Sequence, residues 1–518
     1  MNTGKLIFKP YFVQKGRGPH LDDFAFAGDP KGDTFKSNIT VNKEGVTISE
    51  IGDQNRFYIT IRWNVEGYGY LQMPADNGGK FYELPKSDSS IYNLNFELAK
   101  TRIFRNRRRL ENFKNQNWNP SRELHNFLDL AENYFVDAKK RQKNPERCAS
   151  LSQKALKYGL FASELVELEK ARFDIRQHGN RSDFLYGCDG RGYFQMEEEL
   201  FLERFSELFN YATITHYLTG DFVDFEPEEG QKHFKKRDQL LDDLLRHSVT
   251  VEGRPLFWTH TWVTPDWLKE KNYSQLLKYL EKHIRTVVGH YGDKIKVWEV
   301  VNELHDWANE LELNHEQTIE LTKFACKVAR DTNPDIKLLI NNCCPFAEYV
   351  QKGKWHKKEA LYPQRTPFQF TKELIEAGVD FDAVGVQVYF TRKPVADYIQ
   401  VIERYKELDK DIQLAEVGAP SKGISQEFID PDIEDYTRLP YEWHRHWDEE
   451  LQADWLEQIF TYAYSKPFIK AANWYDLIDG FSFLKNGGLL RSPKGETKSA
   501  VDRLLKLKKK WNDLNNKT

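Results

Sequence analysis

The sequence lacks three features that would assign the chain to a specialised class of protein. No run of about 18 apolar residues is present, so no membrane-spanning helix is predicted. The 75 Lys and Arg residues against 79 Asp and Glu residues give a net charge of −4, without the basic excess of a nucleic-acid binder. The five cysteines are an odd number without CxxC spacing, which argues against a disulfide framework or a structural zinc site. We therefore expect neither nucleic acid nor membrane as a partner.

Signals for location and for flexible tethering are also missing. The first residues, MNTGKLIFKPYF, lack the charged start and apolar core of a secretion signal. A signal that had been removed would leave no trace, so a cytoplasmic and a secreted protein both stay open. No Gly/Ser-rich or Pro-rich linker separates the N-terminal part from the rest, so we expect rigid packing rather than a tether.

Three zones follow one another along the chain. Residues 1–92 alternate short β-rich runs with Gly, Asp, Asn and Pro turns, which predicts a β-sandwich-like accessory domain. Residues 93–182 form a helical connecting region, and residues 183–518 alternate β-like and helix-like segments. The first zone is rich in aromatic residues, which suit either a carbohydrate-binding face or a core. We favour a structural accessory domain over an independent binding module.

The third zone contains eight apolar runs, each followed by an amphipathic stretch. Eight such units predict an α/β fold of the (β/α)8 TIM-barrel type, in which catalytic groups follow the carboxyl ends of the strands. The expected strands are 183–187, 210–218, 254–262, 295–301, 336–341, 382–390, 411–417 and 469–476. The expected helices are 196–209, 236–246, 274–291, 316–331, 367–377, 395–408, 449–465 and 498–512.

Two glutamates stand at the ends of expected strands. Glu303 follows the fourth run and Glu416 closes the seventh. A buried carboxylate is costly unless it is paired or used, so each glutamate either pairs with a barrel Arg or Lys or takes part in catalysis. Hydrolysis of a glycosidic bond needs two carboxyl groups, one to protonate the leaving oxygen and one to attack the anomeric carbon or activate water.

Residues 183–505 resemble glycoside hydrolase family 10, the family of retaining endo-1,4-β-xylanases. The segment 298–303, WEVVNE, resembles W-D-V-V-N-E, and 415–417, AEV, resembles the T-E-L-D segment. Segments 253–258 and 264–268 resemble G-H-T-L-V-W-H-x-Q-x-P-x-W, and 385–389, GVQVY, is similar to G-I-G-L-Q-x-H. The resemblance implies that Glu303 is the acid/base, that Glu416 is the nucleophile and that Asn302 contacts the sugar 2-hydroxyl.

The departures from the family pattern fall at sugar-binding positions. His216 and Thr219 replace the Asn and Lys after the second strand, Arg254 replaces a His, and Tyr389 replaces the His of Q-x-H. Other candidates follow the motifs: Tyr389 as a donor to Glu416, Gln387 as a ligand of sugar hydroxyls, Trp474 as the floor of the −1 site, and Trp258, His260 and Trp262 as its walls.

The neighbours of Glu303 also raise the question of a metal. His305 and Asp306 suggest a ligand pair, but no third ligand is in view, so a surface loop is the preferred interpretation and no metal or cofactor is predicted.

The function predicted from these residues is retaining hydrolysis of internal β-1,4-linkages in xylan, with a polysaccharide or oligosaccharide as substrate. Two alternatives stay open. One is a retaining β-glycosidase of the same barrel clan that acts on a non-xylan β-glycan. The other is a non-catalytic carbohydrate-binding protein, which would be expected to have lost one carboxylate. Oligomeric state is left open.

Overall fold

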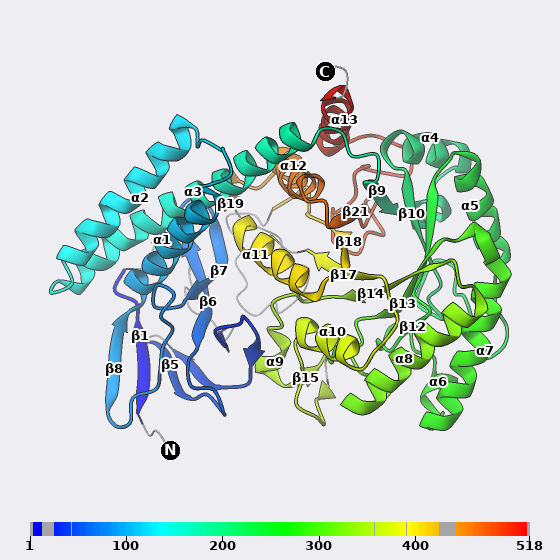
Figure 1. The fold of residues 1–518 in the computed structure, drawn as a ribbon, viewed down its shortest axis with the longest axis horizontal. Coiled ribbons are helices and arrows are strands. Elements are labelled where there is room, and N and C mark those ends of the chain that lie inside the picture. Colours follow the sequence, from blue (N-terminus) through cyan, green and yellow to red (C-terminus); the bar gives the residue numbers. More distant parts are fainter. Residues whose placement is uncertain are drawn as a thin grey trace. The chain divides into compact units, whose positions relative to one another are not determined.

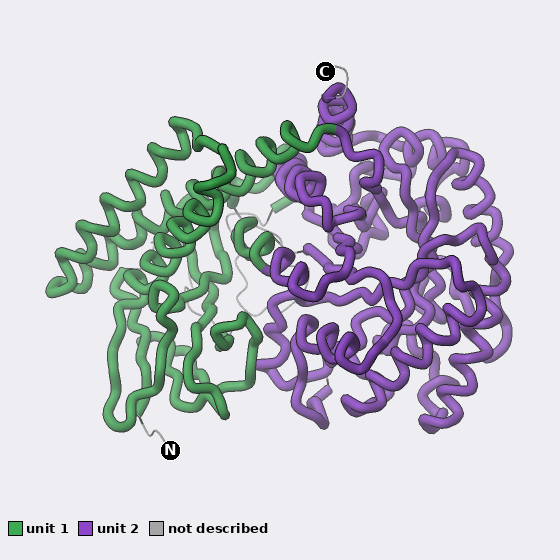
Figure 2. The backbone as a smooth tube through the Cα atoms, in the orientation of Figure 1, with its two compact units in different colours: residues 1–179, 390–400, 421–451 green, residues 180–389, 401–420, 452–518 purple. Residues whose placement is uncertain are grey.

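The computed structural model describes residues 4–12, 25–42, 44–356, 358–389, 391–423 and 442–514. The chain forms two compact units, coloured separately in Figure 2. Unit 1 contains Met1–Gly179 together with two later segments, Phe390–Gln400 and Ser421–Leu451, and unit 2 contains Asn180–Tyr389, Val401–Pro420 and Gln452–Thr518. Among the described residues, no helix is long and apolar enough to cross a membrane.

Unit 1 begins with two four-stranded sheets. One has the order β4-β5-β1-β8 and the other β3-β2-β6-β7. Val46 and Ile48 of β5 are fully buried, and Leu6 and Phe8 of β1 are as deeply buried, because alternate residues of a strand share one face. The strands are β1 (Lys5–Lys9), β2 (Phe26–Gly28), β3 (Thr34–Phe35), β4 (Asn38–Asn42), β5 (Gly45–Glu50), β6 (Tyr58–Val65), β7 (Gly69–Ala75) and β8 (Ser89–Asn93), with the later pair β19 (Glu442–Trp443) and β20 (Arg445–His446).

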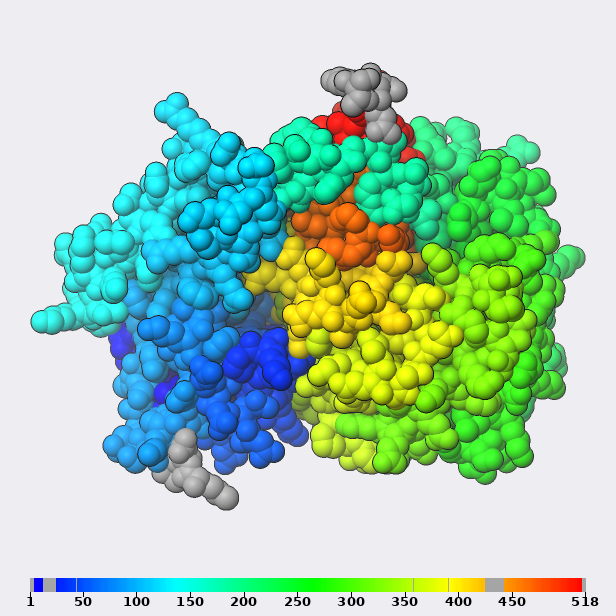
Figure 3. Space-filling view, in the orientation of Figure 1, coloured from blue at the N-terminus to red at the C-terminus, as the bar shows by residue number. Residues whose placement is uncertain are grey.

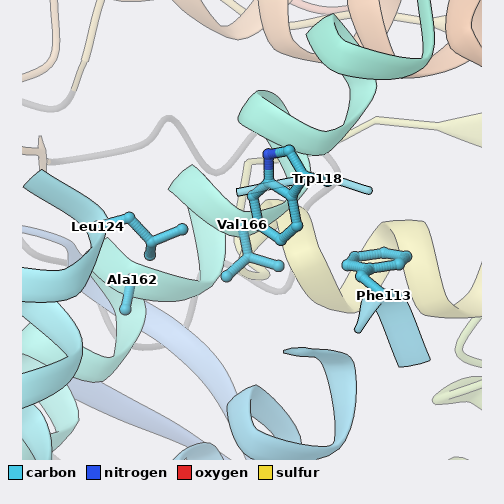
Figure 4. Packing of buried hydrophobic residues seen from close by; sticks show 5 residues of the cluster. All are labelled: Phe113, Trp118, Leu124, Ala162 and Val166. Atoms are coloured by element: carbon cyan, nitrogen blue, oxygen red, sulfur yellow. The ribbon is translucent and has the colours of Figure 1, made fainter. Parts of the chain in front are cut away.

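Three long helices follow in unit 1, and each begins at a capping residue. Asn93, Ser121 and Asn144 accept a hydrogen bond from the third residue of the helix that each precedes, which satisfies a backbone N–H that the helix leaves free. The helices pack around a small apolar cluster, shown in Figure 4 as Phe113, Trp118, Leu124, Ala162 and Val166. They are α1 (Leu94–Phe113), α2 (Arg122–Lys140) and α3 (Pro145–His178).

Unit 2 is a closed barrel of eight parallel strands, which confirms the predicted fold. The order is β11-β10-β9-β21-β18-β17-β14-β13, and β11 also pairs with β13, so the sheet closes on itself (Figure 1). The strands are β9 (Leu185–Asp189), β10 (Tyr211–Thr215), β11 (Thr250–Arg254), β12 (Phe257–Trp258), β13 (Val297–Asn302), β14 (Lys337–Asn342), β17 (Ala383–Val388), β18 (Asp411–Val417) and β21 (Ile469–Trp474). The short pair β15 (Lys354–Trp355) and β16 (Lys358–Glu359) lies in a loop.

Helices alternate with these strands and form the outer layer of the barrel. In the space-filling view, the green segments that include α5 and α7 cover part of its outer face (Figure 3). The main helices are α4 (Glu198–Leu208), α5 (Lys235–Arg246), α7 (Tyr273–Tyr291), α8 (His315–Thr332), α10 (Pro367–Glu376), α11 (Val395–Tyr405), α12 (Glu449–Ser465) and α13 (Ser499–Asn512). Single turns form α6 (Asp266–Lys269), α9 (Tyr349–Lys352), η1 (Gly190–Phe194), η2 (Gly292–Lys294) and η3 (Lys406–Leu408).

The third strand differs from its predicted position at 254–262. It is β11 (Thr250–Arg254), continued only by the short β12 (Phe257–Trp258). Pro255 separates the two pieces, because proline has no N–H to donate to a neighbouring strand. β11 contains the polar residues Thr250, Glu252 and Arg254, so a search for apolar runs does not detect this strand. Its Gly253 pairs with Trp298, and a Cβ there would lie 2.3 Å from the Trp298 ring, so only glycine closes the barrel at this point.

Candidate active site

The two predicted glutamates lie at the carboxyl end of the barrel strands. Glu303 directly follows β13, and Glu416 is the last residue but one of β18. Both side chains are buried. The backbone of Glu303 has a φ of 53°, a left-handed conformation that costs a non-glycine residue free energy, and its N–H is held by the carbonyl of Asn341 at 2.8 Å. Unusual backbone of this kind is common where a side chain is aimed into a functional site.

A single amide joins the two carboxylates. Nε2 of Gln387 donates to Oε1 of Glu303 at 2.8 Å and to Oε1 of Glu416 at 3.2 Å. Those two oxygens are therefore at most 6.0 Å apart, the sum of the two bond lengths. Gln387, predicted from sequence as a ligand of sugar hydroxyls, thus sets the spacing of the glutamates.

Glu416 is surrounded by donors. The hydroxyl of Tyr389 donates to Oε2 at 2.7 Å, the contact expected of it from the sequence. On the other oxygen, Nδ2 of Asn341 donates at 3.0 Å, and Nη2 of Arg254 makes a direct ion pair. Hydrogen bonds and positive charge both favour the ionised form of a carboxyl group, which is the form that attacks carbon.

Glu303 has the opposite environment. Burial, with the negative charge of Glu416 adding to it, raises the pKa of Glu303 to about 8, although Gln387 and Arg254 act to lower it. Its Oε2 has no hydrogen-bond partner in the protein. A carboxyl group with this pKa carries a proton at neutral pH and can donate it to a leaving group.

Arg254 corrects the sequence prediction that it binds sugar directly. Its guanidinium is 1% exposed and pairs with Glu416, while its Nε lies 3.3 Å from Oε2 of Glu299. Side chains two residues apart on a strand share a face, so Arg254 points into the barrel with Glu252. Arg254, which stands where the family has a histidine, therefore pairs with carboxylates of the protein itself.

His216 is also not placed for sugar binding. Its Nε2 lies 3.1 Å from the Tyr291 hydroxyl, and its ring packs against Phe225, Tyr291 and Trp298. Tyr291 is the last residue of helix α7, so this contact shows that His216 faces the helical layer. Successive side chains of a strand point to opposite faces, so a residue at the end of β10 can point either into the barrel or toward the helices. Burial, together with the nearby positive charge of Arg237, lowers the pKa of His216 well below its usual value, which keeps the imidazole neutral.

The three aromatic residues predicted as walls of the sugar site lie in contact at the end of β12. Half-buried Trp258 stacks on His260 with ring centres 5.1 Å apart, and Trp262 meets the His260 ring edge-on at 4.6 Å. Trp262 is 54% exposed, whereas His260 is fully buried. Burial lowers the pKa of His260 to about 3, with a smaller contribution from His356, so the imidazole is uncharged at neutral pH.

Two further candidates differ in their surroundings. Asn302, the last residue of β13, is buried, and its Oδ1 has no partner in the protein, which leaves an acceptor beside Glu303 for a ligand. Trp474, predicted as the floor of the site, has no exposed surface, and its Nε1 donates to the carbonyl of Gly487 at 2.9 Å. Trp474 therefore supports the end of β21 from within the fold and presents no open face.

His305 and Asp306 are not on a surface loop, contrary to the sequence interpretation. Both are buried, and Arg365 binds Asp306 through its backbone N–H and two guanidinium nitrogens, at 2.7 to 3.0 Å. His305 contacts the Tyr349 hydroxyl at 2.9 Å. Within the described ranges, no group of three or more His, Cys, Asp and Glu side chains is arranged to hold a metal ion.

Sequence reasoning missed several polar groups beneath the two glutamates. Asn341 ends the apolar run of β14, so the filter that found Glu303 and Glu416 would also have found it. Glu252 and Glu299 lie within strands, where polar residues are read as helix-facing or exposed, yet both are fully buried. Tyr475 follows β21, and the centre of its ring lies 5.6 Å from Cζ of Arg254.

Comparison with known proteins agrees with this geometry. The sequence model of Glycosyl hydrolase family 10 matches residues 208–506, which is more than half of the chain. The chain belongs to glycosyl hydrolase family 10. It is therefore a glycoside hydrolase, and the matched residues include both glutamates.

Individual relatives of this family 10 hydrolase are distant. Endo-1,4-beta-xylanase B of Thermotoga neapolitana is 24% identical over 297 residues, which cover 56% of this chain and 75% of the relative. Exoglucanase XynX of Acetivibrio thermocellus is 28% identical over 223 residues, covering 39% of this chain and 19% of the relative. The crystal structure of xylanase 10B from Thermotoga petrophila RKU-1 in complex with xylobiose has a TM-score of 0.47 and 21% identity, over 63% of this chain and 95% of that one.

Proposed function

We propose that the protein is a retaining endo-1,4-β-xylanase that cleaves internal linkages of xylan by double displacement. The observation that carries the proposal is the Gln387 bridge, because it limits the nearest oxygens of Glu303 and Glu416 to 6.0 Å. Retaining glycosidases hold their two carboxyl groups about 5 to 5.5 Å apart, whereas inverting enzymes need about 6.5 to 9.5 Å to admit a water molecule. The name of the Thermotoga relative supports xylan as the substrate.

In the first step, the Glu416 carboxylate forms a bond to the anomeric carbon as the bond from that carbon to the leaving oxygen breaks. The proton of Glu303 passes to that oxygen. The raised pKa of Glu303 keeps this proton available at neutral pH, and Asn341 and Tyr389 hold the Glu416 carboxyl in position by hydrogen bonds.

In the second step, water attacks the same carbon and gives its proton to Glu303, which is now an ionised base. The bond between Glu416 and the sugar breaks, and its electron pair returns to the carboxylate. Two inversions at one carbon leave the anomeric configuration unchanged.

A substrate must also be held in place. Oδ1 of Asn302, Oε2 of Glu303 and Nε1 of Trp258 are buried polar atoms without partners in the protein, so each can form a hydrogen bond with a hydroxyl group of a substrate. Trp258 and Trp262 provide flat apolar surface for a sugar ring.

A second candidate is a retaining β-glycosidase that acts on a non-xylan β-glycan. It is favoured by the positions of Arg254 and His216, which stand where the family has sugar ligands but are committed to contacts within the protein. The name of the Acetivibrio relative, an exoglucanase, points the same way.

Reducing ends released from a panel of β-1,4- and β-1,3-linked polysaccharides test both candidates, with Glu416→Ala as the inactive control. Xylan as the best substrate, with products of several lengths, supports the first. Preference for another glycan selects the second, and activity equal to that of the control on the whole panel excludes both. In an NMR time course, the β-anomer must form first from a β-linked substrate, and the α-anomer first would exclude retention.

A further inference from the structure

Arg254 is the cationic group in direct contact with the Glu416 carboxylate. Its Nη2 pairs with Oε1 of Glu416, and its Nε lies 3.3 Å from Oε2 of Glu299. The guanidinium thus lies between a carboxylate on β18 and a carboxylate on β13. Asn341 donates to both, at 3.0 Å to each, and closes the group into a ring of four side chains.

This ring lies in a part of the barrel with an excess of acidic groups. Glu252, Glu299, Glu303 and Glu416 are all buried, and burial raises the pKa of the first three. The other titratable groups that interact with Arg254 or Glu416 are Tyr217, Tyr389, Tyr475 and Cys343. Asp189, Asp476 and Arg191 are the charged neighbours of these tyrosines.

Tyr389, which follows β17, and Arg254 of β11 contact Glu416 from different strands. Tyr389 offers Glu416 a neutral hydroxyl, and its ring carbons would lie 3.0 Å from a Cβ at Gly418. Gly418, which follows the strand that carries Glu416, therefore leaves room for this ring and has no side-chain charge of its own. Arg254 reaches Glu416 from the opposite part of the barrel wall.

We propose that Arg254 is a catalytic residue that serves as the fixed charge partner of Glu416, and that Glu299 is a positioning residue that holds Arg254 on it. The proposal rests on the proposed function, because it assigns Glu416 as the nucleophile. Arg254 stays charged at every working pH, and its planar fork spans two carboxylates, which a point charge does not.

The charge acts at a defined moment of the reaction. When the bond between Glu416 and the anomeric carbon breaks in the second step, the electron pair returns to the carboxylate next to Arg254. The guanidinium stabilises this returning charge without reorganisation, because it is already in place. Because an opposite charge favours the charged form of a neighbouring carboxyl group, loss of Arg254 is also expected to change the pH profile of the reaction.

The test compares Arg254→Met, Arg254→Lys and Glu299→Gln with the full-length wild type on an aryl β-xyloside with a good leaving group, for which the second step limits the rate. We expect Arg254→Met to lower kcat at least about tenfold and to move the acidic limb of kcat/KM toward neutral pH by about one unit or more. We expect Arg254→Lys to have smaller effects than Arg254→Met on kcat and on the position of the acidic limb. Glu299→Gln should also move the acidic limb less than Arg254→Met does.

Arg237 supplies the matched control, since it is equally buried in unit 2 but donates to the backbone carbonyls of Thr215 and Val223. Arg237→Met lowers stability without moving the acidic limb. A folded Arg254→Met protein with the acidic limb of the wild type overturns the proposal. If Arg254→Met does not fold, the double variant Arg254→Met/Glu299→Gln replaces it, because it removes the positive and the negative charge together. If the double variant does not fold either, the comparison of Arg254→Lys with the wild type tests the proposal.

A measurement without substrate separates this proposal from the proposed function. A double-mutant cycle of unfolding with Arg254→Met and Glu416→Gln reports their coupling directly, because each change removes the ion pair. We expect the unfolding constants to be coupled by at least about threefold, and additive effects overturn the pairing. If the two changes are coupled but the protein hydrolyses no glycan on the panel, the proposed function is wrong and the pairing of Arg254 with Glu416 still holds.

Discussion

The two units of the molecule bury charge in different ways. In unit 1, Nη2 of Arg102 donates to both oxygens of Asp397 at 2.9 Å, and the two oxygens of Glu164 contact Nε1 of Trp443 and Nε2 of His444. In unit 2, four glutamates lie close together inside the barrel around Arg254. Burial, with the negative charge of Glu416 adding to it, raises the pKa of Glu303 to a value suited to a general acid.

The comparison shows how structural and reactive burial differ. A buried charge that is paired in place holds elements together, as Arg102 of α1 holds Asp397. A buried carboxyl with an unpartnered oxygen, such as Oε2 of Glu303, keeps a free energy cost that a substrate can relieve. Among the aromatic residues of the N-terminal zone, Trp63 and Tyr68 are buried and Tyr58 and Tyr70 are half-buried, whereas Trp262 of the barrel is 54% exposed. This burial favours the structural role predicted for the N-terminal zone.

The largest expected effect comes from the barrel nucleophile. We expect Glu416→Ala to lower kcat/KM by roughly 10⁴-fold or more, because no glycosyl-enzyme can form. Added azide should restore turnover with inverted configuration, since azide then attacks the anomeric carbon directly. NMR of the glycosyl azide gives the configuration, and a retained product would mean that the two glutamates exchange roles.

Glu303→Ala should be smaller in effect and dependent on the leaving group. Loss of a general acid costs about 10² to 10⁴-fold on natural linkages and far less on an aryl glycoside with a good leaving group. The wild-type kcat/KM should fall above about pH 8, because the raised pKa keeps Glu303 protonated below that value and ionises it above. The pH profile of Glu303→Ala should lack this basic limb, and a limb that persists would assign it to another group.

The matching change in unit 1 should affect stability and leave the chemistry intact. Arg102→Met leaves Asp397 with only its longer contact to Nη1 of Arg105 at 3.5 Å, so we expect the free energy of unfolding to fall by at most about 3 to 5 kcal/mol, with kcat per folded molecule unchanged. Urea unfolding and active-site titration measure the two quantities. The exposed pair Lys114 and Glu111 is the control, and Lys114→Met should cost less than about 1 kcal/mol. A loss of kcat in Arg102→Met would break the division between the units.

The smallest expected effect sharpens the comparison inside the barrel. Tyr389→Phe removes one neutral donor from Glu416 and keeps the ring, so we expect kcat/KM to fall about tenfold, the value of one hydrogen bond to a charged group. Steady-state kinetics at neutral pH measures it. Tyr464→Phe, which removes a hydroxyl bonded to Asn180 at the other end of the unit, should not change the rate. Equal losses in the two variants would indicate a general packing effect.

Several parts of the site could not be predicted from sequence. Strand-end position identified Glu303 and Glu416, but the same rule suggested a sugar contact for His216, whose ring faces helix α7. The direction of a side chain at the end of a strand depends on strand register and twist, and Pro255 interrupts the third strand in a way that an apolar count does not detect. The bridge made by Gln387 and the pair of Arg254 with Glu416 join residues 84 and 162 positions apart.

The sequence by itself determined the barrel and its two glutamates, because alternating apolar periods and a charge at the end of a buried run are local patterns. Only the tertiary structure decided which charges meet. The inclusion of Phe390–Gln400 and Ser421–Leu451 in unit 1 likewise depends on contacts between distant segments. Electrostatic energy depends on distance in space, and closure of the sheet brings Arg254 of β11 to Glu416 of β18. The chemistry of the site therefore resides in contacts across the barrel that no single segment specifies.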